Sequence, residues 1–505
     1  MINKSGGLLF LVFLVSLFPI GLHGQQPCVV DRDLLTQHVY ILASDSMQGR
    51  MTGEPGQQMA AAYIAGQYGQ IGLVPVIGDT SYFQEFTVFR SKPATMRVQG
   101  VRVEVETMAL SAGYEEFAGD GTLYFSYKRS ALDVDKLAEE NGFVLLQPRN
   151  PRHARRVVRR HYREGVRRFA LVADSPLWTY HKMMAEFYEM RYRLTEEPSY
   201  HRIDKIIQGL DSVQVMIVTP GQMSQMIGFN PDFGLLEMDS RSRRAMVPVG
   251  EAIAYSKSPM VAEEIVTENV VGMIHGTRGL DEVVVVTAHY DHMGVDDKGI
   301  HAGADDNASG TAALIEIARV LQCMQDSGEV FNRSVVFVAF SAEEVGLLGS
   351  EYFVTSEPFR AMNPLMNINM DMIGRSVKYS TFQAMRLQAT ATNYREDHSL
   401  RESYVYLMNK GRGTRRFVRH ARRIASNDHP GFTIDRSPGL MKRITYRYGS
   451  DHASFIKEGI PVMVWFTGLH PDYHTPRDTP DRIDYENMTR ITDVILKTTL
   501  QIISE

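Results

Sequence analysis

The chain has 505 residues, of which 44% are hydrophobic and 22% are charged, and this balance excludes a mostly disordered or fibrous protein. The length predicts two or more folding units, because single hydrophobic cores rarely grow beyond about 250–300 residues. The 54 basic and 59 acidic residues give a net charge of −5, which does not favour nucleic-acid binding as the main function. The only cysteines are Cys28 and Cys323, so a disulfide framework and a cysteine-rich zinc or iron–sulfur site are excluded.

The first residues predict a secretory signal peptide. A lysine near the start precedes the apolar run 8–18, which is too short to span a membrane comfortably; a short membrane anchor is the alternative. We expect cleavage after Gly24, which removes residues 1–24. Because small residues do not precede Cys28, lipidation is not expected. The mature protein is expected to be exported, to a periplasm or the medium, without stable membrane insertion.

Residues 25–97 combine helix and loop. The spacing of apolar residues predicts a helix at 34–44 and a stronger one at 57–73 that ends at Gly72. The stretch between them is rich in turn-forming residues and predicts a loop.

Residues 98–261 predict a smaller inserted domain, either α/β or rich in β-strands. Segments 96–110 and 121–127 alternate apolar and polar residues, and residues 143–174 follow a strand–helix–strand pattern. Nine arginines lie between Arg149 and Arg168, which raises a nucleic-acid or anionic-surface interpretation. We favour a solvated helix face with Val157, Val158 and Val166 turned inward, because an exported protein is in the wrong compartment for nucleic acid.

From residue 262 onward, strands alternate with helices. Buried strands are expected at 281–292, 334–340, 366–374 and 461–468, and a helix is expected at 307–324. Continuous apolar strands between helices predict an α/β fold with a mixed, largely parallel sheet covered by helices on both faces. Ligands of such sheets bind at the carboxyl ends of the strands, where the charged residues of this half collect.

Polar residues end the first of these strands and precede the helix that follows it. His289 and Asp291 share one face of a strand, which suits a metal ligand and the carboxylate that orients it, although strand-end histidines also cap loops. Asp305, Asp306 and Asn307 precede a helix, where they could be helix caps. Adjacent carboxylates repel unless a cation neutralises them, so a cation site is the alternative.

The later strand ends add more acids and histidines. Glu343 and Glu344 follow a buried strand and point in different directions, so one can bind metal while the other faces water. Asp371 is a lone acid in an apolar stretch, which is costly unless it is paired or coordinated. A loop at 469–476 carries two histidines and a tyrosine. Together these residues offer about the ligand set that two metals sharing a carboxylate require.

The motifs AHYDH, GADDNASG, AEEVGLLGS, NMDMIG, GSDHASF and DYHTPRDT occur in this order across residues 262–505. They resemble the co-catalytic zinc peptidases, which include secreted bacterial aminopeptidases, glutamate carboxypeptidase, glutaminyl cyclase and the transferrin receptor. Residues 42–75 also resemble an N-terminal segment of bacterial members. The resemblance implies that residues 25–97 and 262–505 form the peptidase domain, with 98–261 as an insert that is weakly similar to a protease-associated domain.

The resemblance also implies a role for each matching residue. The predicted zinc ligands are His289 and Asp371 for one ion, Glu344 and His474 for the other, and Asp306, rather than Asp305, as the bridge. Asp291 is predicted to orient His289, Glu343 to be the general base, and Tyr473 to donate to the developing oxyanion. The peptide bond between Asp306 and Asn307 is expected to be cis.

The implied activity is that of an exported exopeptidase that uses two zinc ions to hydrolyse N-terminal residues from peptide substrates. A carboxypeptidase and a single-zinc glutaminyl cyclase are alternatives on the same fold, and a binding module with an inactive site is a third. The complete ligand set favours two metals but does not separate an aminopeptidase from a carboxypeptidase. Residues 374–449, which help to build the specificity pocket in relatives, contain no motif that predicts a substrate side chain.

Overall fold

The computed structural model describes residues 28–76, 80–91, 95–99, 104–111, 117–126, 132–173, 192–194, 206–207, 209–227, 246–248, 253–257, 262–390, 398–435 and 449–505. The predicted signal peptide, residues 1–24, lies outside these ranges. Among the helices in these ranges, none combines the length and the hydropathy that a membrane span requires.

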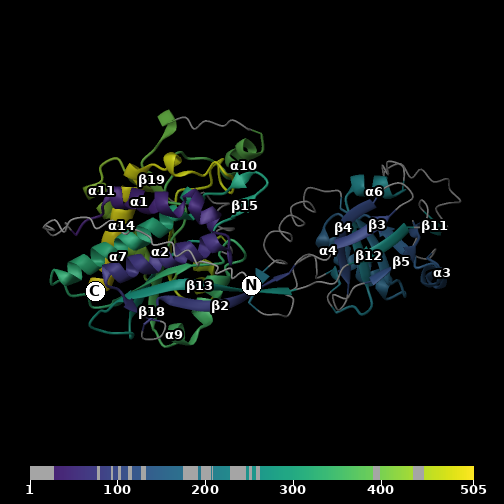
Figure 1. Ribbon diagram of the computed structural model, residues 1–505, viewed down its shortest axis with the longest axis horizontal. Coiled ribbons are helices and arrows are strands. Elements are labelled where there is room, and N and C mark those ends of the chain that lie inside the picture. Colours follow the sequence, from purple (N-terminus) through teal and green to yellow (C-terminus); the bar gives the residue numbers. More distant parts are fainter. Residues whose placement is uncertain are drawn as a thin grey trace, which may run out of the picture.

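A ten-stranded mixed sheet forms the first body (Figure 1). Its order is β20 (Thr433–Asp435), β19 (Tyr404–Lys410), β21 (Val462–Phe466), β18 (Pro364–Met370), β14 (Val283–His289), β17 (Ser334–Phe340), β13 (Ala262–Ile274), β2 (Phe83–Ser91) and β9 (Tyr192–Arg193), with β1 (Val74–Pro75) on β13. The four central strands, β17, β14, β18 and β21, are parallel to one another. The four expected buried strands of this half are therefore confirmed. Because they are parallel, their carboxyl ends lie along the same edge of the sheet.

Helices cover both faces of this sheet, as predicted. Along β14, Val284, Val286 and Ala288 join one apolar core, whereas Val283 and Val285 join the core of the opposite face. The first core is shared with helices α1 (Arg32–Leu42), α2 (Pro55–Ile71), α7 (Gly310–Asp326), α11 (Thr414–Asp428) and α14 (Tyr485–Ser504). The second core is shared with α8 (Leu348–Thr355), α9 (Glu357–Arg360) and α13 (His452–Lys457). Burial of both faces explains why β14 has no alternating polar residues.

A second, nine-stranded sheet forms a separate body in Figure 1. Its order is β11 (Met246–Pro248), β6 (Leu123–Ser126), β7 (Phe143–Leu146), β8 (Arg168–Val172), β10 (Gln214–Val218), β4 (Glu104–Ser111), β3 (Thr95–Gln99), β12 (Ile253–Lys257) and β5 (Phe117–Gly121). Helices α3 (Val134–Glu139), α4 (Pro151–Tyr162) and α6 (Pro220–Ile227) accompany it. The first sheet borders this insert at the end of β2 and the start of β13, where Ser91 pairs with Ala262, and β9, from within the same stretch of the chain, also pairs with β2 of the first sheet. The domain boundaries at 98 and 261 stay predictions.

The arginine-rich segment forms α4, and its packing agrees only in part with the prediction. Val158 and Val166 are buried, whereas Val157 is half-buried.

A disulfide between Cys28 and Cys323 links the segment before α1 to helix α7.

The helix expected at 307–324 begins three residues later, at Gly310. Asp306 and Asn307 have non-helical backbone angles within the irregular turn η7 (Ala304–Ser309), and the peptide bond between them is cis, as the resemblance implied. The Asn307 side chain caps α7, because its Oδ1 accepts the amide of Gly310 at 2.9 Å. Apolar periodicity does not reveal this turn, since the turn is as buried as the helix that follows it.

Candidate metal centre

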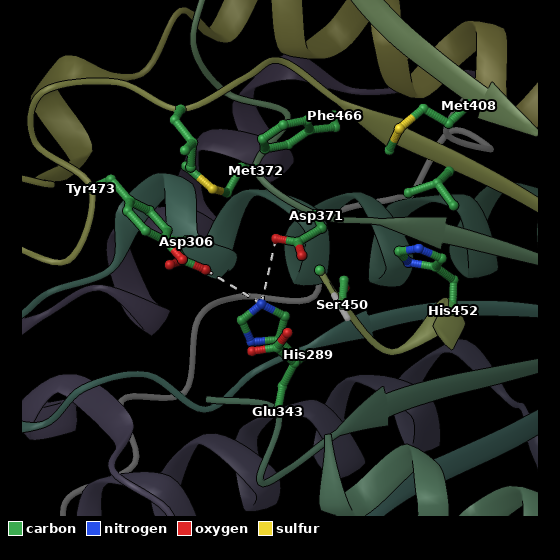
Figure 2. Close-up of a pocket in the computed structure, with 13 residues that line it drawn as sticks. His289, Asp306, Glu343, Asp371, Met372, Met408, Ser450, His452, Phe466 and Tyr473 are labelled. Atoms are coloured by element: carbon green, nitrogen blue, oxygen red, sulfur yellow. Dashed lines mark ion pairs between the residues drawn. The ribbon is translucent and has the colours of Figure 1, made fainter. Parts of the chain in front are cut away.

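His289 is the last residue of β14, and the end of the neighbouring strand β18 places Asp371 beside it. The His289 Nε2 atom lies 3.3 Å from Asp306 Oδ1 and 3.5 Å from Asp371 Oδ1, and Figure 2 shows the three side chains pointing toward one another. The other ring nitrogen, Nδ1, faces Asp291, 3.2 Å from its backbone oxygen and 3.7 Å from its Oδ1. One imidazole and two carboxylates therefore converge on the Nε2 side.

A second group of side chains lies on the other side of Asp306. His474 Nε2 is 3.0 Å from Asp306 Oδ2 and 3.1 Å from Glu344 Oε2. Asp306 thus directs one oxygen toward His289 and the other toward His474. The structure brings all five predicted ligands together in two groups that share this carboxylate.

The neighbouring acid, Asp305, points elsewhere. Its Oδ1 accepts the amide of Gly374 at 2.6 Å, and its Oδ2 lies 3.2 Å from Nε2 of His470. Of the two adjacent aspartates, only Asp306 contacts both His289 and His474, so the geometry agrees with the bridging position assigned by resemblance.

Asp291 has more contacts than its predicted role requires. Its carboxylate accepts the amides of Glu343 and Glu344 at 3.1 and 3.3 Å and the hydroxyl of Thr52 at 3.0 Å. The carboxylate that faces His289 therefore also fixes the turn that carries both glutamates.

The charges of this centre shift the pKa values of its groups. Burial raises the pKa of Glu343 well above its usual value, and repulsion from Glu344 and Asp371 adds to the shift while His289 opposes it. Burial lowers the pKa of His474, but the carboxylates of Glu344 and Asp306 outweigh it and raise that pKa to about 10. Protons therefore balance part of the negative charge in the metal-free centre, at positions where a divalent cation would compete with them.

Two properties of the centre suit zinc: it has buried polar atoms without hydrogen-bond partners, and its side chains are of the types that bind zinc. Asp306 Oδ2, Asp371 Oδ1 and His474 Nε2 are buried and have no hydrogen-bond partner among the described residues. The atoms of His289, Asp306 and Asp371, and separately those of His292, Asp306 and Glu344, lie close enough together to share an ion. Imidazole nitrogen and carboxylate oxygen are both zinc ligands, and such buried donors need a cation or protons.

The sequence did not predict a role for His292. This fully buried histidine places Nδ1 2.8 Å from Oε1 of Glu344, while the other oxygen of Glu344 faces His474. Two imidazoles therefore flank the same glutamate. The motif AHYDH contains two histidines, but the two-residue period of a strand pairs only His289 with Asp291. The sequence pattern therefore predicts a role for His289 and none for His292.

The loop that carries Tyr473 and His474 is held by a second unpredicted cluster. The fully buried Asp472 accepts hydrogen bonds from three arginines: Arg375, Arg477 and Arg482. A few residues on, Asp478 Oδ2 accepts the amides of both Asp305 and Asp306, at 3.0 and 3.1 Å. The bridging carboxylate and the His474 loop are thereby fixed relative to each other.

Arg50, in the short helical segment η1 (Asp45–Arg50), is buried behind the centre. Its guanidinium donates to the carbonyls of Tyr290, Ala302 and Gly303 at 2.6–2.9 Å, and to that of Leu42. Because these carbonyls belong to the segments before Asp291 and Asp306, this cation joins the two loops. Burial lowers the pKa of Arg50 to about 10, although the surrounding carboxylates oppose the shift.

A cavity of about 190 Å³ opens beside His289, Glu343 and Asp371. Figure 2 shows Tyr473 on one side of Asp371, and Met408 and Phe466 farther from His289 than Asp371 is. The apolar walls of the cavity are made by Met372, Met408, Val464, Phe466 and Leu469. The ring of Tyr473 also stacks on that of His474, with 3.8 Å between the centroids.

Residues 269–499 match the family model described as Peptidase family M28. Among curated proteins, the chain is 28% identical over 221 residues to Aminopeptidase YwaD of Bacillus subtilis, covering 42% of this chain and 40% of the relative. It is 30% identical over 228 residues to a Glutamate carboxypeptidase 2 homolog of Caenorhabditis elegans, covering 42% and 26%. The chain thus spans less than half the length of these relatives.

Two solved structures share the fold over nearly the whole chain. An aminopeptidase from Aneurinibacillus sp. strain AM-1 has a TM-score of 0.53 at 17% identity, covering 94% of both chains. The zinc aminopeptidase BSAP from Bacillus subtilis has a TM-score of 0.50 at 17% identity, covering 95% of this chain and 97% of its own. At this level of identity the likeness concerns the fold.

Proposed function

Because residues 269–499 match the family model described as Peptidase family M28, we propose that this chain is a zinc-dependent exopeptidase that removes N-terminal residues from peptides. The observation that carries the proposal is the pair of ligand groups that share Asp306. His289 and Asp371 would hold one zinc ion, and Glu344 and His474 the other. When bound, zinc supplies a Lewis acid that polarises a carbonyl and lowers the pKa of a water molecule.

Glu343 is the proposed general base. It lines the cavity beside His289, where its carboxylate can take a proton from the attacking water. A carboxylate that holds this proton can then deliver it to the leaving amine. Asp291 keeps Glu343 in place through its hydrogen bond to the Glu343 amide. Tyr473, which borders the same cavity, is the proposed donor to the developing oxyanion.

The apolar cavity is the proposed site for the side chain of the N-terminal substrate residue. Met408, Val464 and Phe466 line it, and these residues favour a large apolar side chain over a charged one. The carboxylates at its inner end would favour a free α-amino group. A blocking acetyl group would remove that positive charge and add bulk there, which supports aminopeptidase over carboxypeptidase action.

The deciding experiment combines zinc analysis of the purified protein with a peptide panel. We expect two zinc ions per chain, cleavage of peptides with a free N-terminus and an apolar first residue, and loss of cleavage on N-acetylation. A blocked C-terminus should have little effect. Equal cleavage of acetylated peptides that requires a free C-terminal carboxylate would establish a carboxypeptidase. One zinc ion per chain together with cyclisation of N-terminal glutamine would establish a cyclase. Absence of turnover at full zinc content would establish a binding module with an inactive site.

We also propose that the enzyme is exported. The predicted signal peptide supports this, and so does the disulfide between Cys28 and Cys323, because disulfides persist mainly in oxidising compartments. N-terminal sequencing should find a mature chain that begins near Gln25. An intact Met1 on a cytosolic protein would contradict export without affecting the peptidase proposal.

A further inference from the structure

One face of helix α4 consists only of arginine. Successive residues of an α-helix are about 100° apart, so six positions of this helix and its C-cap fall within an arc of about 140°. They are Arg152, Arg155, Arg156, Arg159, Arg160 and Arg163. No other residue between 151 and 163 falls within this arc, which we call the arginine face. An ordinary solvated helix face mixes both signs of charge.

The opposite side of α4 packs against the nine-stranded sheet. Ala154 and Val158 are completely buried and pack in a core with Val144 and Phe169 of the nine-stranded sheet. Most of the apolar surface of the helix is therefore already covered by its own domain, and the exposed side is charged. Whatever α4 binds must be recognised through the guanidinium groups.

Five of the six arginines of the arginine face have no ion-pair partner in the described part of the chain. Arg152, Arg155, Arg156, Arg160 and Arg163 are exposed, and none of them forms an ion pair with a described residue. Like charges three and four positions apart destabilise a helix. The repulsion is visible at Arg159, whose pKa is lowered by partial burial and then by Arg155 and Arg163.

The choice of arginine indicates the chemistry of a partner. Residues 149–168 contain nine arginines and no lysine. Lysine would serve solubility equally well, whereas the planar guanidinium forms paired hydrogen bonds with phosphate oxygens. The row from Arg152 to Arg163 is about 17 Å long, at 1.5 Å per residue, and suits a partner that presents many phosphates on an extended surface.

We propose that the arginine face docks the protein on a phosphate-bearing lipid surface, which it binds peripherally and without insertion. This role is separate from peptide hydrolysis. Lipid is favoured over single-stranded nucleic acid because no aromatic side chain lies within the arc to stack on bases. The predicted export of the protein also favours a membrane surface.

Helix α11 offers a matched control. It contains the same five residues, Arg-His-Ala-Arg-Arg, at 419–423 as α4 has at 152–156. In α11, however, part of the charge is paired within the chain, because Arg416 forms an ion pair with Glu505 at 2.7 Å. Replacing Arg415, Arg419 and Arg423 removes the same charge at the same spacing as replacing three arginines of α4.

The test is co-sedimentation of the purified protein with phosphatidylcholine vesicles that contain increasing amounts of phosphatidylglycerol. We expect binding that grows with phosphatidylglycerol and weakens with salt. The triple substitution Arg152→Gln, Arg156→Gln, Arg160→Gln should weaken it about a hundredfold, since each arginine contributes roughly fivefold near an anionic surface. Lysine at the same three positions should retain most of the binding, and glutamine at the three α11 positions should change it by no more than a few-fold.

Three outcomes would overturn the proposal. The wild-type protein could fail to bind phosphatidylglycerol vesicles, or the α4 and α11 glutamine variants could lose binding equally, which would indicate net charge alone. A DNA duplex bound more tightly than vesicles at the same salt, with the same dependence on α4, would assign the arginine face to nucleic acid. Unchanged circular dichroism and peptide turnover in the α4 variant would show that its fold is intact.

Discussion

The acidic metal centre and the arginine face of α4 both concentrate charges of one sign, but only the centre is buried. At the centre, Asp306 is almost fully buried, and the carboxylates around it shift one another's pKa values and those of the histidines. On α4 the charged groups are exposed, and water and salt screen their repulsion. Buried like charges therefore require protons or a bound cation, whereas exposed ones permit a partner that binds reversibly.

The largest expected effect is at Glu343. Glu343→Gln keeps the size of the side chain and removes the proposed base, so turnover should fall by about 10²–10⁴-fold while zinc content stays unchanged. Glu351→Gln is the control, because Glu351 is a surface residue of α8 that pairs with Lys457. Steady-state kinetics with zinc analysis checks both variants. Near-normal turnover of the Glu343 variant at full zinc occupancy would disprove the assignment.

The two histidines that flank Glu344 provide the next comparison within the centre. His474→Ala should lose one of the two zinc ions, because it removes a proposed ligand that faces both Asp306 and Glu344. His292→Ala should keep both ions but weaken zinc binding about 10–100-fold, as loss of a residue that orients a ligand does. Zinc content after dialysis against a graded chelator series measures the difference. The reverse order would make His292 the ligand.

A smaller effect is the pH dependence of zinc binding. In the metal-free protein the pKa of His474 is about 10, so this histidine carries a proton at neutral pH. A histidine must be neutral to bind zinc, and the metal therefore displaces that proton. Raising the pH removes the competing proton, so affinity should rise with pH, by up to about tenfold per pH unit for each proton released.

Chelator competition across neutral pH measures this slope. His474→Ala should flatten it, whereas His429→Ala should not, because His429 pairs with Asp493 away from the centre. A pH-independent zinc affinity in the wild-type protein would show that protons do not balance the acidic centre.

The fold of residues 262–505 was predictable because the strands of this half carry a local signal. Strands β14 and β17 are continuous apolar runs, and each ends at a polar motif, so their position and the meeting of their ends follow from the sequence. The start of α7 was missed by three residues, since the turn η7 before it is as buried as the helix and apolar spacing does not separate the two.

The parts of the site that were not predicted depend on contacts between distant residues. Met408 and Phe466 line the cavity because β19 and β21 pair antiparallel, and no local pattern specifies that pairing. Arg50 donates hydrogen bonds to backbone carbonyls. Because every residue has a carbonyl, no side-chain motif predicts which residues Arg50 contacts. His292 lies three residues beyond His289, outside the two-residue period of the strand. A sequence thus indicates the side chains that form a centre more readily than the residues that hold those side chains in place.

The smallest expected effect concerns the stability of α4. Because its like charges repel, Arg152→Gln, Arg156→Gln and Arg160→Gln together should raise the free energy of unfolding, by about 0.2–0.5 kcal/mol for each i,i+4 pair removed. The gain should shrink at high salt, where the repulsion is already screened. Urea unfolding of the variant and the wild-type protein at low and high salt measures it. A loss of stability that does not depend on salt would mean that these arginines support the fold, and the contrast with the buried centre would then disappear. A salt-dependent gain would instead show that the arginine face is retained at a cost to stability, as expected of a surface kept for a partner.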